Sequence, residues 1–277
     1  MRGQAELSSR LRMEDDLLDL APGTVLAGTP YRVLRRLGGG GMGAVFEGEH
    51  VRLRKRRVCI KTVHPGLRGR NEYLERMEIE GQTLARLDHP GIVRVFDLGV
   101  TDDGIPFFVM ERLEGKDLRK LLQAKRFFEL RDALTVAEDV LLALAHAHRE
   151  GVVHRDIKPE NIFLAVSDAE TVTKVLDFGI AQVADDRRGL TGQRFLGTCQ
   201  YASPEQLRGE PVTEKSDLYA MGCVLFELVT GRRPFPGPGT AQYIQQHLNE
   251  TPPRLSSLVA VPQALDELVA SALAKDP

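Results

Sequence analysis

The octapeptide HRDIKPEN, from His154 to Asn161, gathers side chains that could transfer a phosphoryl group. Asp156 can accept the proton of an attacking hydroxyl, and Lys158 can neutralise a phosphate. Asn161 offers a neutral oxygen to Mg²⁺, and Asp177, in the downstream LDFG, adds a carboxylate. Mg²⁺ prefers a few such oxygens together with phosphate and water. A helix cap or a surface turn would not require all these residue types at once, so the pattern predicts phosphoryl transfer to a hydroxyl.

Lys61 ends the otherwise apolar run VCIK, where it could be an ordinary strand-edge lysine that reaches water. Glu80 favours a different role, because it lies within NEYLERMEIEGQTLARL, residues 71–87. There it shares a predicted helical face with Tyr73, Met77, Leu84 and Leu87. A carboxylate on an inward helix face is costly unless it is paired. We therefore predict an ion pair in which Glu80 holds Lys61 against the α- and β-phosphates.

The segment LGGGGMGAV places Gly38, Gly40 and Gly43 in GxGxxGxV spacing between two predicted strands. A dinucleotide-binding fold would need a helix directly after the glycines, and a Walker loop would need Gly-Lys-Ser/Thr. Neither is present. A plain flexible hairpin is one interpretation. The other is a strand-turn-strand flap whose backbone lies over phosphates and offers N–H donors.

The elements that must position these residues change in type along the chain. Before residue 113, short runs rich in β-branched and aromatic residues predict an antiparallel sheet: YRVLRRL, AVFEGEH, VCIKTV, VRVFDLG and FFVMERL. After it, helical periods dominate: LRKLLQAKRF, DALTVAEDVLLALAHAHREG, DLYAMGCVLFELVTG and ALDELVASALAK. Gly151 is the expected terminator of the second of these helices. The predicted class is α+β, with a small antiparallel sheet lobe that carries one key helix, a larger mainly helical lobe and a cleft between them.

The predicted boundaries follow from the same pattern. Residues 1–24 are polar apart from LLDL, so we expect a flexible arm, with a short amphipathic helix as the alternative. The folded region is residues 25–277, with a small lobe over about 25–112 and a large lobe over about 113–277. The final LVASALAKDP is typical of a boundary inside a larger protein, so we expect the large lobe to continue beyond it.

Composition narrows the class of partner. The 277 residues carry a net charge of −2, so no overall electrostatic attraction to nucleic acid or to an anionic membrane is expected. Three cysteines without CxxC spacing indicate neither a disulfide framework nor a zinc site. No apolar run approaches the length of a membrane span, and the N-terminus lacks a signal-peptide core. We expect a cytoplasmic location, which leaves open a membrane anchor beyond Pro277.

From about residue 25 to its end, the chain resembles the eukaryotic-like protein serine/threonine kinases of bacteria. The resemblance lies in GTVLAGTPYRVLRRLGGGGMGAVFEGEH, LDHPGIVRVFDLG, RDIKPENI and GTCQYASPEQ. It implies a bilobal kinase fold, ATP with Mg²⁺ (or Mn²⁺) as cofactors, and protein substrates with Ser or Thr acceptors. Lys158 is the residue of Ser/Thr-type kinases and argues against tyrosine specificity. A homodimer through the small lobe is also implied only by this resemblance.

The resemblance assigns further residues. Met110 matches the gatekeeper, Glu111 to Leu113 match the hinge, and Thr198 matches the substrate-loop threonine that braces Asp156. Leu84, Val95, His154 and Phe178 match the hydrophobic spine, and Asp217 matches the support of the catalytic loop. The expected nucleotide-binding set is Leu37, Gly38, Gly40, Gly43, Val45, Cys59, Lys61, Met110, Glu111, Leu113 and Phe163.

Regulation and departures from the family pattern add expectations. Arg155 could hold a phosphorylated activation loop, with Thr191 as the first choice of phosphosite and an unmodified Thr191 as the alternative. Cys59 replaces the usual alanine above the adenine, and Ser203 replaces the alanine of the APE motif. Glu205 normally pairs with an arginine that would lie beyond Pro277, so its partner is in question. Redox sensitivity of Cys199 is a minor alternative.

Two other functions fit parts of the pattern. A pseudokinase or docking module would have the same fold, but such proteins usually lose a member of the set Lys61, Glu80, Asp156, Lys158, Asn161 and Asp177. A small-molecule phosphotransferase would lack the substrate loop that GTCQYASPEQ supplies. The complete set therefore favours an active protein kinase, which we also expect to autophosphorylate its activation loop.

Overall fold

The computed structural model describes residues 20–40, 43–53, 56–63, 81, 84, 86–167, 170–178 and 199–276. Glu80, Thr191, Thr198, the arm up to residue 19 and most of the predicted helix 71–87 lie outside these ranges. The chain divides into two compact units. Unit 1 comprises Met1–Arg86 and Arg94–Leu113, and unit 2 comprises Leu87–Val93 and Glu114–Pro277.

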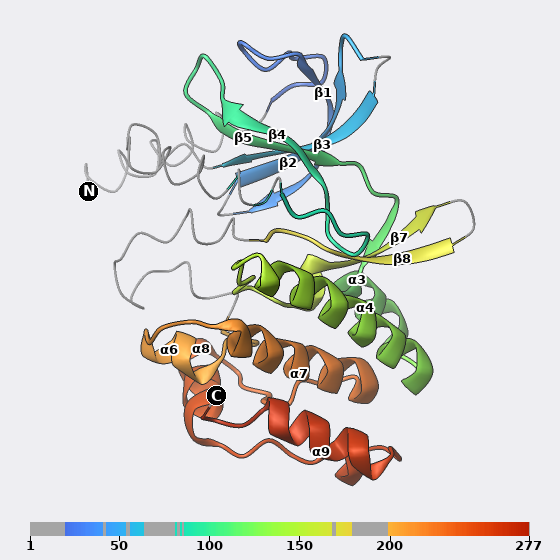
Figure 1. The fold of residues 1–277 in the computed structure, drawn as a ribbon, viewed down its shortest axis with the longest axis vertical. Helices are drawn as coiled ribbons and strands as arrows, with labels where there is room; N and C mark the ends of the chain where they lie inside the picture. Colours follow the sequence, from blue (N-terminus) through green and yellow to red (C-terminus); the bar gives the residue numbers. More distant parts are fainter. Residues whose placement is uncertain are drawn as a thin grey trace, which may run out of the picture. The chain divides into compact units, whose positions relative to one another are not determined.

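Unit 1 is built on a five-stranded antiparallel sheet (Figure 1). Its strands are β1 (Tyr31–Gly40), β2 (Gly43–His50), β3 (Arg56–Val63), β4 (Val95–Val100) and β5 (Pro106–Glu111), in the order β1-β2-β3-β5-β4. All five strand-like runs of the sequence become strands. The fourth begins only at Val95, because the preceding Val93 belongs to unit 2, where its N–H bonds the carbonyl of Val175 at 3.0 Å.

The register separates two faces of this sheet. Directly opposite residues of an antiparallel pair share a face. Phe46 opposes Ile60, which opposes Val109, and all three side chains are fully buried. They belong to the core face, with Leu26, Tyr31, Val33, Ala44, Val58 and Phe107. The alternate positions form the other face, which carries Val45, Cys59, Lys61, Phe108 and Met110.

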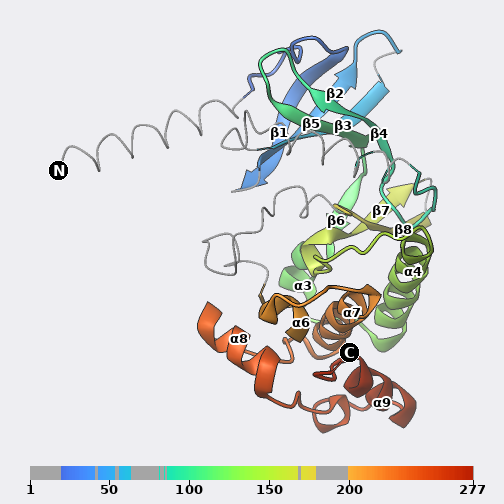
Figure 2. The ribbon, with the colours of Figure 1, turned by 60° about the vertical axis from the view of Figure 1, so that its left-hand side comes forward.

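Unit 2 is mainly helical (Figure 2). Its helices are α3 (Leu118–Lys125), α4 (Leu130–Arg149), α6 (Pro204–Arg208), α7 (Glu214–Thr230), α8 (Thr240–Asn249) and α9 (Gln263–Ala272), with 3₁₀ turns η2 (Pro159–Asn161) and η4 (Leu255–Ser257). Helix α7 packs against both α4 and α9 and is buried around its whole circumference, from Ser216 to Val229 apart from Leu218. Its run YAMGCVLF is accordingly apolar without amphipathic spacing.

Local signals end helices α4 and α7 where the sequence predicts. Gly151 follows the last residues of α4 with φ +75°, and Gly231 caps α7 with φ +71° and donates its N–H to the carbonyl of Glu227. Helix α3 stops at Lys125, two residues before the predicted end, because Arg126 takes φ +70°. Among the described helices, none has both the length and the apolar composition needed to cross a bilayer.

A three-stranded sheet in unit 2 goes beyond the sequence prediction, in which helical segments dominate after residue 113. Its strands β6 (Gly115–Asp117), β7 (Ile162–Ser167) and β8 (Glu170–Val175) lie in the order β6-β7-β8. Gly115 opposes Ala165 with φ +138°, and a Cβ there would lie 2.0 Å from the carbonyl oxygen of Leu164. Only glycine fits this crossing of two backbones.

Replacement of Gly115 by alanine should therefore strongly destabilise the protein. Gly151→Ala is the matched control, because Gly151 also has positive φ but a Cβ at its position would meet nothing within 4 Å. The control should lose about 1–2 kcal/mol through backbone strain alone. Gly115→Ala should lose at least about 1–2 kcal/mol more. Urea unfolding measures both, and equal losses would contradict the clash with Leu164.

Candidate active site

Loop 154–161 of unit 2 brings three of the predicted residues into contact. The Nζ of Lys158 donates to both carboxylate oxygens of Asp156, at 3.0 and 2.7 Å. The side-chain nitrogen of Asn161 donates to the Asp156 carboxylate at 3.0 Å and to the Asp156 carbonyl at 2.8 Å. The side chains of Asp156 and Lys158 are only 11% and 16% exposed. The carboxylate is thus fixed in orientation by two donors before any substrate arrives.

The same contacts orient Asn161. Both of its partners on Asp156 are acceptors, so its amide must present the nitrogen to them and its oxygen elsewhere. Asn161 directly precedes β7, and Asp177 is the second residue after β8. Because β7 and β8 are antiparallel, with Ile162 opposite Val175, both residues lie at the same end of this hairpin. The N–H of Leu176 also donates to the Asn161 carbonyl at 2.8 Å.

This donor set is suited to a hard divalent cation, because it consists of an amide oxygen and a carboxylate. Asp177 takes φ +59°, a backbone conformation that is uncommon for a residue other than glycine. No group of three or more His, Cys, Asp or Glu side chains able to hold a metal occurs in the described part of the chain. Asn161 and Asp177 could therefore hold a cation only if it also takes ligands from phosphate or water.

The buried carboxylate of Asp217, on α7, fixes the backbone of the loop. It accepts the N–H of His154 and the N–H of Arg155, both at 2.8 Å, and it contacts Nε2 of His148 at 2.8 Å. Arg155 takes φ +69°, a strained conformation for this residue. Hydrogen bonds to a charged acceptor offset that strain.

His154 joins the loop to the start of LDFG. Its Nε2 bonds the Leu176 carbonyl at 2.7 Å, and its Nδ1 accepts the N–H of Asp156 at 3.2 Å. Its ring packs edge-on against Phe178, with centroids 4.6 Å apart. The predicted spine members of unit 2 therefore contact each other.

Helix α6 ties loop 154–161 to loop 199–203, the described residues just after Thr198. The side chain of Gln206 donates to the Arg155 carbonyl at 2.8 Å, while its oxygen accepts the N–H of Ser203 at 3.0 Å. The carboxylate of Glu205, which is 5% exposed, accepts the hydroxyl of Ser216. Buried Glu205, whose partner was in question, thus has a hydrogen-bond donor within the chain, and this donor is a neutral hydroxyl.

A buried charge network holds the other side of loop 199–203. The guanidinium of Arg119 contacts Glu160 at 2.7 Å and Glu227 at 2.8 Å, and it also bonds the hydroxyl of Tyr201. Tyr201 in turn donates to Glu227. Burial opposes the charge on Arg119, but the hydrogen bond with Glu227 and the other partners raise its pKa above the ordinary value. Burial, followed by the charge of Glu227, likewise raises the pKa of Tyr201.

The predicted site residues include no member of this network. The sequence nevertheless carries one signal for it. Glu227 is the lone charge in the apolar run CVLFELVT, just as Glu80 is a carboxylate on an apolar stripe. The requirement for a cationic partner applies to both. Arg119, Tyr201 and Gln206 carry no comparable signal, because only the tertiary fold brings them to their partners.

The predicted nucleotide-binding residues divide between the units. Lys61 is half-buried on β3, opposite Val45 and Phe108, and Cys59 lies opposite Met110 on the same face. Leu37 is exposed at an irregularity of β1 beside Gly38, and Gly40 pairs with Gly43 where β1 and β2 join.

The remaining predicted nucleotide-binding residues lie at the end of unit 1 and in unit 2. The backbone N–H of Glu111 donates to the Arg94 carbonyl at 2.9 Å, and the Glu111 carboxylate accepts the N–H of Arg94 at 2.8 Å. Leu113 ends unit 1, while Phe163 lies in β7 of unit 2, half-buried.

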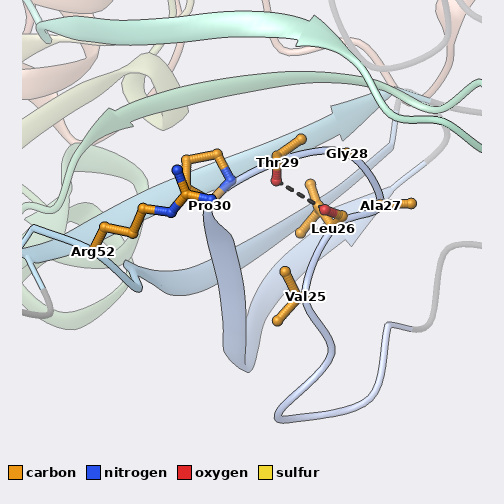
Figure 3. Close-up of a pocket in the computed structure, with 7 residues that line it drawn as sticks. All are labelled: Val25, Leu26, Ala27, Gly28, Thr29, Pro30 and Arg52. Carbon is orange, nitrogen blue, oxygen red and sulfur yellow. Dashed lines mark hydrogen bonds between the residues drawn. The ribbon is translucent and has the colours of Figure 1, made fainter.

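A hollow in unit 1 of about 580 Å³ involves none of these residues (Figure 3). The segment leading into β1, residues 25–30, lines it together with Arg52. The turn there is closed by Thr29, whose Oγ1 donates to the Leu26 carbonyl at 3.0 Å. Arg52 is its one charged lining group, and we assign no ligand to it.

Comparison with known proteins decides the family. The family described as "Protein kinase domain" matches residues 31–277. The chain belongs to this family. The kinase domain of PknI from Mycobacterium tuberculosis, a crystal structure, matches with a TM-score of 0.72 at 27% identity over 92% of each chain. The protein kinase fold expected from the sequence is confirmed.

Relatives point to the bacterial branch named by the resemblance. Serine/threonine-protein kinase PrkC of Bacillus subtilis is 42% identical over 248 residues, which are 89% of this chain and 38% of that protein. A probable serine/threonine-protein kinase PknB of Bifidobacterium longum is 38% identical over 265 residues, which are 91% of this chain and 38% of that protein. The chain thus spans about two-fifths of the length of these curated relatives.

Asp217→Asn should loosen loop 154–161. An asparagine presents an amide nitrogen to one backbone N–H that Asp217 now satisfies, and an unsatisfied buried donor costs about 1–3 kcal/mol. Amide hydrogen exchange at His154 and Arg155 should accelerate about 10- to 100-fold. His148→Ala is the control, because it removes a side-chain contact and leaves both N–H bonds. Equal acceleration in the two variants would show that Asp217 does not act through the loop backbone.

Arg119→Met should destabilise the protein by about 3 kcal/mol, because it removes a cation from the buried Glu227. In Arg119→Met combined with Glu227→Gln, the loss should fall short of the sum of the single losses by about 1–3 kcal/mol. Arg208→Met is the control, since Arg208 pairs with the exposed Glu210 at 3.6 Å and should cost under about 1 kcal/mol. Denaturant unfolding measures all four variants. Strict additivity of the double variant would argue against a coupled pair.

Proposed function

We propose that this chain is a protein serine/threonine kinase that transfers the γ-phosphate of ATP to protein hydroxyls. The observation that supports it most is the contact of Asp156 with Lys158 and Asn161 in a loop whose backbone is fixed by Asp217. Membership of the protein kinase family and relatives named serine/threonine-protein kinases support the same activity.

Asp156 would act mainly by position. In phosphoryl transfer the protein contributes positioning and charge stabilisation more than strong basicity. The Asp156 carboxylate would accept a hydrogen bond from the acceptor hydroxyl, orient it towards the γ-phosphate and take its proton at an oxygen. Lys158, already beside this carboxylate, would neutralise charge on the transferred group. Thr198 would brace both residues from the substrate loop.

Unit 1 would supply the nucleotide contacts. The face that carries Val45, Cys59, Lys61 and Met110 would receive ATP, with Lys61 on the α- and β-phosphates and Glu80 as its partner. The glycines Gly38, Gly40 and Gly43 would cover the phosphates with backbone N–H groups. Backbone groups of Glu111 and Leu113 would bind adenine. Leu37 and, from unit 2, Phe163 would complete the set.

Asn161 and Asp177 would hold the divalent cation. When bound, the cation neutralises the phosphate oxygens of ATP and fixes their geometry. Mg²⁺ is our choice over Mn²⁺, because the described residues supply few ligands and Mg²⁺ typically completes its shell with phosphate and water.

Activation by autophosphorylation belongs to the same proposal. Arg155 lies next to Asp156, and its buried Nε has no hydrogen-bond partner among the described residues. A phosphorylated Thr191 would supply an acceptor for it.

We also propose that residues 25–277 act as one kinase domain after an arm of residues 1–24. A homodimer would form through the small lobe, and the chain would work in the cytoplasm. The buried thiols of Cys199 and Cys223 accord with a reducing compartment.

Redox control through Cys199 is not part of the proposal. Burial raises the pKa of this thiol, and a thiol kept protonated is a poor nucleophile towards oxidants.

Asp156→Asn should lower phosphate transfer about 10²- to 10⁴-fold, since it removes the proton acceptor and the partner of Lys158. Transfer of label from ATP to a generic basic protein, with Mg²⁺ present, measures it. Asp139→Asn is the matched control, because this carboxylate accepts a hydrogen bond from Thr173 and lies outside the proposed site. Equally little transfer by wild type and Asp156→Asn would overturn the proposed activity.

A further inference from the structure

A chain of hydrogen bonds links the end of unit 2 to loop 199–203. The Nε2 of His247, on α8, lies 3.1 Å from the carbonyl oxygen of Gln200. The other ring nitrogen, Nδ1, lies 2.9 Å from the hydroxyl of Tyr219, on α7. That hydroxyl accepts a hydrogen bond from the Nζ of Lys275 at 3.3 Å. Four segments distant in sequence thus meet through three side chains, and His247 is fully buried.

Chemistry fixes the direction of every bond in this chain. A carbonyl oxygen only accepts, so His247 must carry its proton on Nε2 and donate to Gln200. Nδ1 then has a lone pair, so Tyr219 must donate its hydroxyl proton to it. An ammonium has donors and no acceptor, so Lys275 must donate to Tyr219. Each member therefore orients the next, from Lys275 to the Gln200 carbonyl.

The surroundings of Lys275 keep it at the head of this chain. Its Nζ donates to the carbonyls of His247 at 2.7 Å and Gln246 at 3.3 Å, near the C-terminus of α8. Carbonyl groups at a helix C-terminus favour a cation. Burial lowers the pKa of Lys275 to about 8, so the side chain is still mostly an ammonium near pH 7. The ammonium also lies 4.2 Å from the ring centroid of Phe235. The ammonium of Lys275 therefore has a defined position, which is set by contacts with α7, with α8 and with the segment before α8.

The ionisation of His247 agrees with this arrangement. Burial, followed by the charge of Lys275, lowers the pKa of His247 to about 4. The imidazole therefore stays neutral near pH 7 and keeps the tautomer that donates to Gln200. Protonation of Nδ1 would remove the acceptor for Tyr219.

We propose that Lys275 is a positioning residue for loop 199–203, acting through Tyr219 and His247 on the Gln200 carbonyl. The inference rests on the proposed kinase function, in which this loop follows Thr198 and presents the protein substrate. On its other sides the loop is fixed by Tyr201 with Glu227 and by Ser203 with Gln206. The Gln200 carbonyl is a further anchor, and Lys275 controls it from the last segment of the described chain.

Tyr219→Phe is the sharpest test, because it removes the central hydroxyl and keeps the ring beside Lys275. Lys275→Met removes the head of the chain, and Lys275→Arg keeps a cation with several donors. A net hydrogen bond of about 0.5–1.5 kcal/mol corresponds to a change of about 3- to 10-fold. Hydrogen exchange in peptides spanning residues 199–203 of the full chain should accelerate by that factor in Tyr219→Phe and Lys275→Met. Exchange in Lys275→Arg, which keeps a charged donor, should accelerate less than in Lys275→Met.

Activity should change in one parameter only. With a generic basic protein as acceptor, KM for the acceptor should rise about 3- to 10-fold in both variants. Hydrolysis of ATP without acceptor should keep its rate, because loop 199–203 would not touch the nucleotide. The double variant Tyr219→Phe with Lys275→Met should be no worse than either single variant, because both break one chain.

Arg254→Met separates this role from general support of α9. Arg254 pairs with Asp266 of α9 at 3.1 Å and has no hydrogen bond or ion pair with the Lys275 chain among the described residues. This control should leave exchange in residues 199–203 unchanged. Equal acceleration in Arg254→Met, or none in Tyr219→Phe and Lys275→Met, would overturn the inference. A wild-type chain that transfers no phosphate would overturn the proposed function instead, and the exchange data would still decide the role of Lys275.

Discussion

The geometry of the site depends on the hydrogen bonds that the carboxylate of Asp217 accepts from loop 154–161. It satisfies two consecutive backbone N–H groups of loop 154–161, at the one turn where Arg155 takes φ +69°. A loop of irregular backbone lacks the regular hydrogen-bond partners of a helix or sheet, and a buried N–H without a partner costs as much as a lost hydrogen bond. Asp217 therefore stabilises the strained turn that sets Asp156 beside Lys158 and Asn161.

The same physical requirement explains helix α7 as a whole. Its apolar residues bury it against α4 and α9, and its few polar side chains must then find partners in the interior. Each of them bonds a different segment. Ser216 reaches Glu205 of α6, Asp217 reaches loop 154–161, Tyr219 reaches His247 of α8, and Glu227 reaches Tyr201. A hydrophobic helix thereby becomes the common support of the segments proposed to bind substrate and to perform the chemistry.

In unit 1, the two faces of the sheet separate the apolar core from the residues proposed to bind the nucleotide. One face is closed by a core of aliphatic and aromatic residues, including Phe46, Ile60 and Val109, all fully buried. The period of two in each strand then places Val45, Cys59 and Lys61 together on the opposite face. A shift of register by one residue would move Lys61 into the core, where an unpaired ammonium is costly. The apolar core therefore fixes where the charge can lie.

Sequence alone determined the residue types that are proposed to do chemistry and the kinds of element that carry them. HRDIKPEN, LDFG and the glycine run are local patterns, and hydrophobic periodicity is local too, so the strands of unit 1, the long helices and the family could be predicted. Tertiary structure alone decided which buried polar groups become partners. The pairings of Asp156 with Lys158 and Asn161 join residues close in sequence, but Arg119 with Glu227 and Gln206 with Arg155 join residues far apart. Their partners are set by helix packing, which no local pattern records. The sequence indicates that Glu227 requires a cationic partner but not which residue supplies it. His247, Tyr219 and Lys275 form a directed chain of hydrogen bonds only because packing brings three separate segments together.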